Sequence, residues 1–320
     1  MQRPSFLAHQ TALERGHGTS NCQTLLGMDK VPAENHIRTV LDPVPPETLF
    51  SMFTHTLAAI ATGGGLDAFT RLGGHVLTAL DGTEYFCSQK LACPNCSSRA
   101  RANGKTEHFH AMVSAVMVAP GIDRALPLEP EFITPQDGAD KQDCEHRATA
   151  RWLGRHGARY AHLKPNYLGD DLASQQVTCE AVQEIGAHFL FTAKPSHKTL
   201  FDWLDGADVP TMEQKIKQGA RFVTHRDRWL EAVPVRDGTD ALSVNWLEIE
   251  IVDAAGKVTY RNSFVTDLAV NKANVAELAA CGRARWTIEN ETFNTLKTKA
   301  TTSSTTSVTA SSISRRFWRR

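Results

Sequence analysis

Residues 75–82 read His-Val-Leu-Thr-Ala-Leu-Asp-Gly, and this stretch decides the fold class. The run is short and apolar, and it is bounded by Gly74 on one side and by Asp81–Gly82 on the other. Such a pattern is typical of a buried strand. Two further apolar runs, 109–119 and 125–133, follow after short connections. The three segments together predict an antiparallel meander.

An alternation of helices and strands is predicted after the meander. Residues 140–158 have helical spacing, with Gly157 as the expected stop. A short strand then leads into Asp170, and a helix (177–185) and another strand (188–192) follow. A meander that continues into a β-α-β alternation predicts an α/β fold with one mixed sheet flanked by helices.

The pattern changes twice more towards the C-terminus. Residues 221–270 hold four alternating segments that end in turns, which predicts a β-rich insertion, and helical spacing returns from 274 to 297. We therefore divide the chain into a helical N-terminal region (1–66), the first part of a core (67–199) with a Cys-rich insertion (86–107), the β-rich insertion (200–270), a helix that completes the core (271–299) and a tail (300–320). Eleven of the fifteen residues 300–314 are Ser or Thr, so we expect the tail to be disordered.

Composition excludes several classes of protein. The chain has 320 residues, 41% of them hydrophobic and 22% charged, which rules out a fibrous or wholly disordered protein. Its 35 basic and 35 acidic residues balance, so any nucleic-acid surface must come from local clustering. Seven cysteines are too few for a disulfide scaffold, and no apolar run reaches the roughly 18 residues of a membrane span. Since the first thirty residues also lack the apolar core of a signal peptide, we expect a soluble, cytoplasmic protein.

Three acidic residues are candidates for a shared site. Asp81 and Asp170 each follow a predicted strand, and carboxylates at the strand ends of one sheet can converge in space. Each also has a structural interpretation, as a turn at Asp81–Gly82 or as a helix N-cap at Asp170–Asp171. In the predicted helix 285–297, Arg285 and Glu289 share one face. Glu289 is then either one half of an ion pair or a metal ligand steadied by the arginine, because a carboxylate on a packing face is otherwise costly.

The segments that carry these acids resemble the signature regions of a known family. Residues 79–85, 167–172 and 285–289 are similar, in this order, to the three signatures of DDE-type bacterial insertion-sequence transposases. The branch with a Tyr-Arg-Glu-Lys signature has a β-rich insertion before its final helix, as predicted here. The resemblance covers roughly residues 67–299 and implies a ribonuclease-H-like core.

Carried over to this sequence, the resemblance implies that Asp81, Asp170 and Glu289 form the metal-binding triad and that Arg285 is the signature arginine. The sequence departs from the signature at two positions. Gly282 stands where the tyrosine is expected, and the signature lysine is displaced by one residue, to Lys297.

The activity that this resemblance implies is metal-dependent phosphodiester cleavage and strand transfer of an insertion sequence. Two Mg²⁺ ions, or Mn²⁺ in their place, about 3.5–4 Å apart would bind the attacking and the leaving oxygen. The implied partners are double-stranded DNA, as transposon ends and target, and further copies of the chain assembled on it, with no membrane and with nucleoid association when bound. A non-catalytic DNA-binding transposase remnant and a two-metal nuclease remain as alternatives.

The tail has a possible origin in a frameshift. Codons that encode residues 300–312 can, in a shifted frame, encode Tyr-His-Leu-Glu-His-Asn-Phe-Gly-His-Gly-Lys, which resembles the continuation of the glutamate helix in this family. We therefore expect a frameshift near Lys299, and a start at Met1 that is internal to a longer gene. The sequence leaves open whether such a damaged copy is active; the encoding DNA tests the frameshift directly.

A cysteine cluster and several basic residues lie between the first two strands. Cys87, Cys93, Cys96 and His110 could form a Cys3His zinc site, although reduced thiols in a loop explain the cysteines equally well. No acidic residue occurs between Glu84 and Glu107. The basic residues there could contact DNA phosphates or could simply be a solvated loop; they are Lys90, Arg99, Arg101 and Lys105, and we add Lys297 as a further DNA-contact candidate.

Overall fold

The computed structural model describes residues 6–16, 24–25, 27, 33–41, 43–135, 144–219 and 221–293. Lys297 and the tail predicted for 300–320 lie outside the described residues. The described residues of the N-terminal region contain the helices α1 (Phe6–Glu14), α3 (Glu34–Leu41), η1 (Pro46–Leu49) and α4 (Ser51–Thr62), as predicted, and η2 (Asp67–Phe69) follows this region. Among the described residues, no helix has both the length and the apolar character that a membrane crossing requires.

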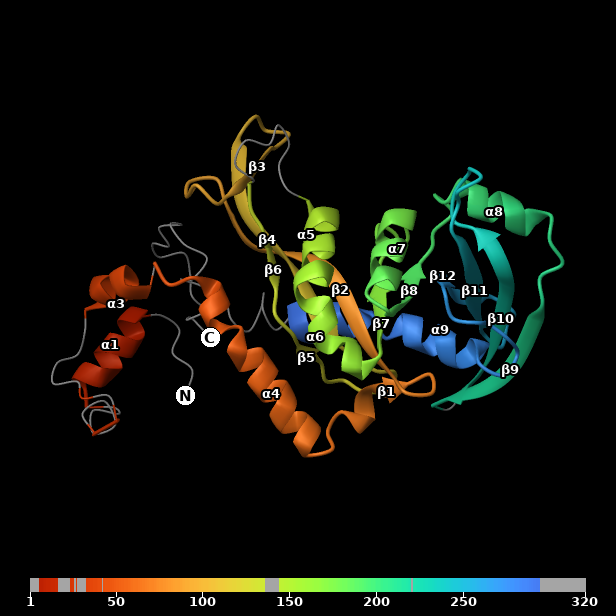
Figure 1. Cartoon of the computed structure of the whole chain (residues 1–320), viewed down its shortest axis with the longest axis horizontal. Helices are drawn as coiled ribbons and strands as arrows, with labels where there is room; N and C mark the ends of the chain where they lie inside the picture. Colours follow the sequence, from red (N-terminus) through yellow and green to blue (C-terminus); the bar gives the residue numbers. More distant parts are fainter. Residues whose placement is uncertain are drawn as a thin grey trace.

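One mixed sheet forms the centre of the molecule (Figure 1). Its main path runs β3-β4-β2-β7-β8-β12-β11-β10-β9, with β1 beside β2 and with β5 and β6 beside β4. The strands are β1 (Thr70–Arg71), β2 (His75–Ser88), β3 (Ser97–Ala100), β4 (Thr106–Met117), β5 (Leu126–Pro127), β6 (Glu131–Ile133), β7 (Pro165–Gly169), β8 (His188–Thr192), β9 (Thr211–Gln218), β10 (Arg221–Pro234), β11 (Ser243–Val252) and β12 (Val258–Thr266).

The predicted meander and the mixed α/β sheet are both confirmed. β2 pairs with β4, and β4 with β6, in antiparallel fashion, whereas β7 is parallel to β2 and β8 is parallel to β7. The third meander strand, predicted over 125–133, is instead the two short strands β5 and β6. Pro127 and Pro130 have no N–H to donate to a ladder, which explains the interruption.

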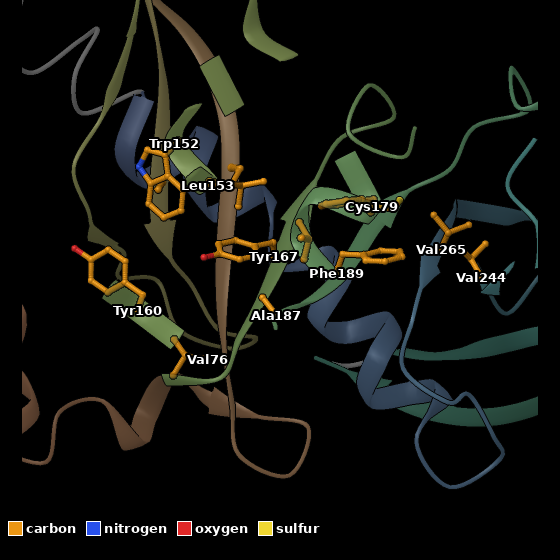
Figure 2. Close-up of a cluster of buried hydrophobic side chains, with 14 of the residues drawn as sticks. Val76, Trp152, Leu153, Tyr160, Tyr167, Cys179, Ala187, Phe189, Val244 and Val265 are labelled. Carbon is orange, nitrogen blue, oxygen red and sulfur yellow. The ribbon is translucent and has the colours of Figure 1, made fainter. Parts of the chain in front are cut away.

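Helices cover both faces of this sheet. The first face packs against α5 (Glu145–Trp152), its continuation η3 (Leu153–Gly157), α6 (Ala158–Tyr160) and η4 (Ala161–Leu163), α7 (Gln176–Glu184) and α8 (Lys198–Asp205). Figure 2 shows Trp152, Tyr167 and Phe189 in this core, where Trp152 and Tyr167 are fully buried and meet edge to face. Helical spacing thus continues past Gly157, the predicted stop.

The second face packs against α9 (Val275–Arg283) and η5 (Ile288–Phe293). Side chains alternate between the two faces along each strand. In β2, Val76 and Leu80 belong to the first core, while Leu77 and Ala79 belong to the second. This alternation directs Asp81 to the same face as α9.

The β-rich segment that follows β8 continues the same sheet. β12 pairs antiparallel with β8, through Phe264 opposite Thr192, and β11, β10 and β9 follow in order. At the other end of the sheet, β3 and the adjoining halves of β2 and β4 extend beyond the helices (Figure 1). We call this three-stranded extension, residues 84–110, the finger.

Candidate active site

Strand register brings Asp81 and Asp170 to one edge of the sheet. The parallel pairing of β2 with β7 ends with Ala79 opposite Leu168, and each aspartate comes two residues after its member of that pair. Residues at equivalent positions of parallel neighbours project from the same face. Both carboxylates therefore lie where β7 ends, on the face that α9 and η5 cover.

The prediction that Asp81 ends its strand is wrong. β2 continues through Gly82 to Ser88, and Asp81 lies opposite Ser114 of β4. The strand persists because β4 remains its partner after β7 has ended. The alternative interpretation of Asp81–Gly82 as a turn is excluded for the same reason.

Arg285 connects Asp81 to Glu289. Its guanidinium donates to Asp81 Oδ2 at 3.1 Å and to Glu289 Oε1 at 3.2 Å. The Arg285 and Asp81 side chains are only 13% and 14% exposed, whereas Glu289 is 40% exposed. The predicted ion pair between Arg285 and Glu289 is thus present, and the same arginine also reaches the first aspartate.

The helix that carries Arg285 and Glu289 differs from the prediction of one α-helix. α9 ends at Arg283, and a π-helical turn follows from Ile288 to Phe293. Ile288 and Phe293 are buried, while Trp286 is 52% exposed. The wider turn lets both apolar residues pack inward while Glu289 stays at the surface of the site.

Asp170 and Asp171 have different partners. Asp171 accepts hydrogen bonds from the Lys194 N–H at 2.7 Å and from Ser196 Oγ at 2.9 Å, and it contacts His197. These bonds fasten the loop after β8. The Asp170 carboxylate accepts only a local bond from the Leu172 N–H, at 2.9 Å, among those described. This difference supports Asp170 as the functional residue of the two.

Glu145 is a fourth carboxylate at the site, and sequence reasoning missed it. It is the first residue of α5, and its Oε1 accepts a hydrogen bond from the Gly82 N–H at 3.0 Å. A Cβ at position 82 would lie 2.2 Å from Glu145 Oε2, so only glycine permits this approach. The glycine after Asp81 was the available signal, because a glycine inside a buried strand often marks close contact with another group.

Crowding of the carboxylates affects their protonation. Burial, opposed by Arg285 and reinforced by Glu145, Asp170 and Glu289, raises the pKa of Asp81 to about 7. Burial, followed by the charge of Asp170, also raises the pKa of Glu145. Four carboxyl groups thus face one guanidinium, and the site has an excess of negative charge that an added cation would relieve.

The acidic oxygens are not gathered around one point. Among the described residues, Asp81, Asp170 and Glu289 do not form a group whose ligand atoms all lie within 4.8 Å of one another. Two ions about 3.5–4 Å apart do not require that closeness, because only the carboxylate that bridges them must reach both. The spacing of these oxygens is therefore compatible with a pair of ions held by the three carboxylates together.

Gly282, which stands where the transposase signature has tyrosine, is fixed by packing. The glycine is buried in α9, and a Cβ there would come within 2.6 Å of the Phe264 ring of β12. Position 282 therefore faces the sheet at Phe264. A side chain as large as tyrosine has no room there.

Glycine at position 82 is expected to be needed for stability as well as for the site. Gly82→Ala should lower the free energy of unfolding by about 1–3 kcal/mol, because the new methyl group displaces the Glu145 carboxylate from its N–H donor. Urea unfolding monitored by circular dichroism measures this. The matched control is Gly154→Ala, where a Cβ meets no atom within 4 Å; equal losses in both variants would contradict the explanation.

The finger brings three of the four predicted zinc ligands together. Cys93, Cys96 and His110 have ligand atoms within 4.8 Å of one another, but Cys87 is not part of the group. Cys87 lies opposite Phe109, and its neighbour Phe86 lies opposite His110, so the Cys87 side chain projects from the other face of the hairpin. The prediction that Cys87 is a fourth ligand of this site is therefore wrong.

The thiols of this cluster do not resemble a redox pair. Burial, together with a hydrogen bond between Cys93 and Cys96, raises the pKa of Cys93 to about 11. Reactive cysteines have lowered pKa values, because the thiolate is the nucleophile.

Two of the predicted DNA-contact residues are already paired with acids. Arg99 donates to Glu84 at 2.5 Å and 3.0 Å and to Glu107 at 2.7 Å, and Arg101 also contacts Glu107. Glu84 and Glu107 flank the basic stretch in sequence, but the hairpin folds them back onto it. Part of the positive charge of this stretch is therefore compensated within the finger. The ion pairs of the described residues include neither Lys90 nor Lys105.

No protein-family model matches the chain, and no curated protein is significantly similar to it.

Proposed function

We propose that the chain is a DNA transposase of the DDE type, with a ribonuclease-H-like core and a divalent-cation site formed by Asp81, Asp170 and Glu289. The observation that carries the proposal is the placement of Asp81 and Asp170 at equivalent positions of β2 and β7, on the face where Arg285 connects Asp81 to Glu289. The order of antiparallel strands followed by parallel β7 and β8 also supports it.

The donor set fits Mg²⁺ or Mn²⁺. Carboxylate oxygens are hard ligands. Burial, opposed by Arg285 and reinforced by the acidic neighbours, raises the pKa of Asp81, and a bound cation would favour its ionised form. Asp81, Asp170 and Glu289 would hold the ions. Such ions would activate the attacking oxygen and stabilise charge on the phosphate.

The side chains of the site contribute in distinct ways. Arg285 compensates part of the negative charge and orients the Asp81 and Glu289 carboxylates. Glu145 holds the backbone of Gly82 and so fixes the strand beside Asp81. The chain needs no serine or cysteine nucleophile for this chemistry, because water or a DNA 3′ hydroxyl attacks the phosphate.

The test is cleavage and joining of defined DNA ends. The purified chain is incubated with labelled duplexes that carry the sequences flanking its gene, in Mg²⁺, Mn²⁺ or Ca²⁺, and with scrambled duplexes as controls. Mg²⁺-dependent cleavage at the flanking sequence followed by transfer of the end into a target plasmid is expected. Cleavage of both duplexes without joining would indicate a two-metal nuclease, and DNA binding without cleavage a non-catalytic remnant.

A further inference from the structure

We propose that Cys93, Cys96 and His110 bind one zinc ion, with a fourth position left to solvent, and that this ion holds the finger together. The three ligand atoms already have the spacing of a zinc site. Cys93 Sγ and Cys96 Sγ are 3.6 Å apart, and each sulfur lies 3.4 Å from His110 Nε2. Ordinary zinc–ligand bond lengths in a tetrahedron require about 3.8 Å between two sulfurs and about 3.6 Å between sulfur and nitrogen.

The backbone around the two cysteines forms a compact turn that aims both sulfurs at the histidine. The Cys96 N–H donates to the Cys93 carbonyl at 3.0 Å, and the Cys93 N–H approaches Cys96 Sγ at 3.3 Å. N–H donors directed at a sulfur stabilise it as a thiolate ligand. The turn is thus suited to holding a cation between the two side chains.

The histidine ring is held in place by aromatic neighbours. His110 is only 5% exposed, and its ring stacks on Tyr85 at 5.7 Å between centroids, with Phe86 at 5.5 Å. Nε2 faces the two sulfurs in this arrangement. A ligand whose ring is already fixed loses little conformational freedom when the ion binds.

The set has three protein ligands. Cys87 projects from the opposite face, where its thiol bonds with Glu107. Among the described parts of the chain, no other His, Cys, Asp or Glu joins the group. Zinc with three protein ligands completes its tetrahedron with water or an exogenous ligand.

A bound metal would stabilise the finger, which has too few strands to bury a large hydrophobic core. Beyond the flanking helices, three short strands cannot bury a large core, and small units of this kind are commonly stabilised by a metal. Zinc would connect the turn at 93–96, between β2 and β3, to His110 of β4. The orientation of the basic residues Lys90 and Lys105 would then depend on the bound ion.

The experiment is metal analysis of the full chain, purified without chelator, together with cobalt substitution. We expect one zinc per chain and, after exchange, Co²⁺ absorption bands typical of tetrahedral coordination with a sulfur-to-cobalt charge-transfer band. Cys93→Ser and His110→Ala should each lose at least about nine-tenths of the zinc at equal free metal. Cys87→Ser is the matched control and should keep the full equivalent.

A second measurement needs no variant and therefore does not depend on how the variants fold. Alkylation of the wild-type chain, mapped by mass spectrometry, should modify the exposed Cys144, and zinc should protect Cys93 and Cys96. A chain with no zinc and no protection would overturn the proposal. Loss of zinc in Cys87→Ser would overturn the three-ligand assignment. Both readouts are independent of DNA cleavage, so the zinc proposal and the proposed function can fail separately.

Discussion

Asp81→Asn is expected to abolish Mg²⁺-dependent DNA cleavage, with a loss of at least about 10³-fold in rate. Asparagine keeps the shape of the side chain but removes the charge that would bind both ions. A loss of 10³ corresponds to about 4 kcal/mol of transition-state stabilisation, which is within the range that metal ions supply. Single-turnover cleavage of the end-labelled duplex, at saturating protein, measures the chemical step.

Asp170 and Asp171 provide a matched pair for the same assay. Asp170→Asn should lose activity as Asp81→Asn does. Asp171→Asn should retain most of it, because its amide oxygen can still accept from the Lys194 N–H and its amide NH₂ can donate to Ser196 Oγ. The reverse result would move the site to Asp171 and contradict the assignment. Activity in Asp81→Asn equal to that of the wild type would show that cleavage does not use this site.

Much of the fold follows from local sequence patterns. The apolar run at 75–80 and the strand 188–192 are recognisable because buried strands are short, apolar and bounded by turn residues. Local patterns do not predict the length of a strand, because that length depends on pairing with a strand that is distant in the sequence. β2 continues past Asp81 because β4 pairs with it as far as Ser88 opposite His108. The break after α9 also depends on packing, since Ile288 and Phe293 are drawn to the sheet.

Most of the residues that meet at the candidate site could be predicted from the sequence, whereas their surroundings could not. Asp81, Arg285 and Glu289 come together as the spacing and the family resemblance predict. Glu145 was missed because it is 63 residues from Gly82 in the sequence, and the periodicity of a sequence does not predict contacts between such distant residues. In the finger, charges that are separate in sequence cancel, as between Arg99 and Glu107, once β3 and β4 pair.

The stability of the Mg²⁺-free protein should depend on pH through Asp81. The pKa of Asp81 is about 7 in the folded chain and 3.8 in the unfolded chain. The folded state therefore holds the extra proton between these values, and the contribution of Asp81 to stability falls as pH rises from about 4 to about 7. Between pH 5 and pH 8 this loss amounts to about 3 kcal/mol, at 1.36 kcal/mol per pH unit.

Other groups titrate in the same range, so the contribution of Asp81 must be isolated by difference. Burial lowers the pKa of His75, His156 and His225, which makes stability rise with pH, whereas burial raises the pKa of Asp227 to about 6, which acts in the same direction as Asp81. These groups are common to the wild type and to Asp81→Asn. Relative to the wild type, the variant should therefore gain about 3 kcal/mol between pH 5 and pH 8 in urea unfolding.

Divalent cations should offset the loss of stability at high pH in the wild type but not in Asp81→Asn. At pH 8, Mg²⁺ at about 100 times its dissociation constant should stabilise the wild type by about 2.7 kcal/mol, because the ion binds the folded carboxylates and relieves their repulsion. Asp81→Asn lacks one of the charges that would hold the ion and should gain much less. Equal stabilisation of both proteins by Mg²⁺ would place the cation elsewhere, and a pH-independent difference between them would show that Asp81 is ionised in the folded chain throughout this range. The linkage thus tests the cation site even in a copy of the protein that has lost its catalytic activity.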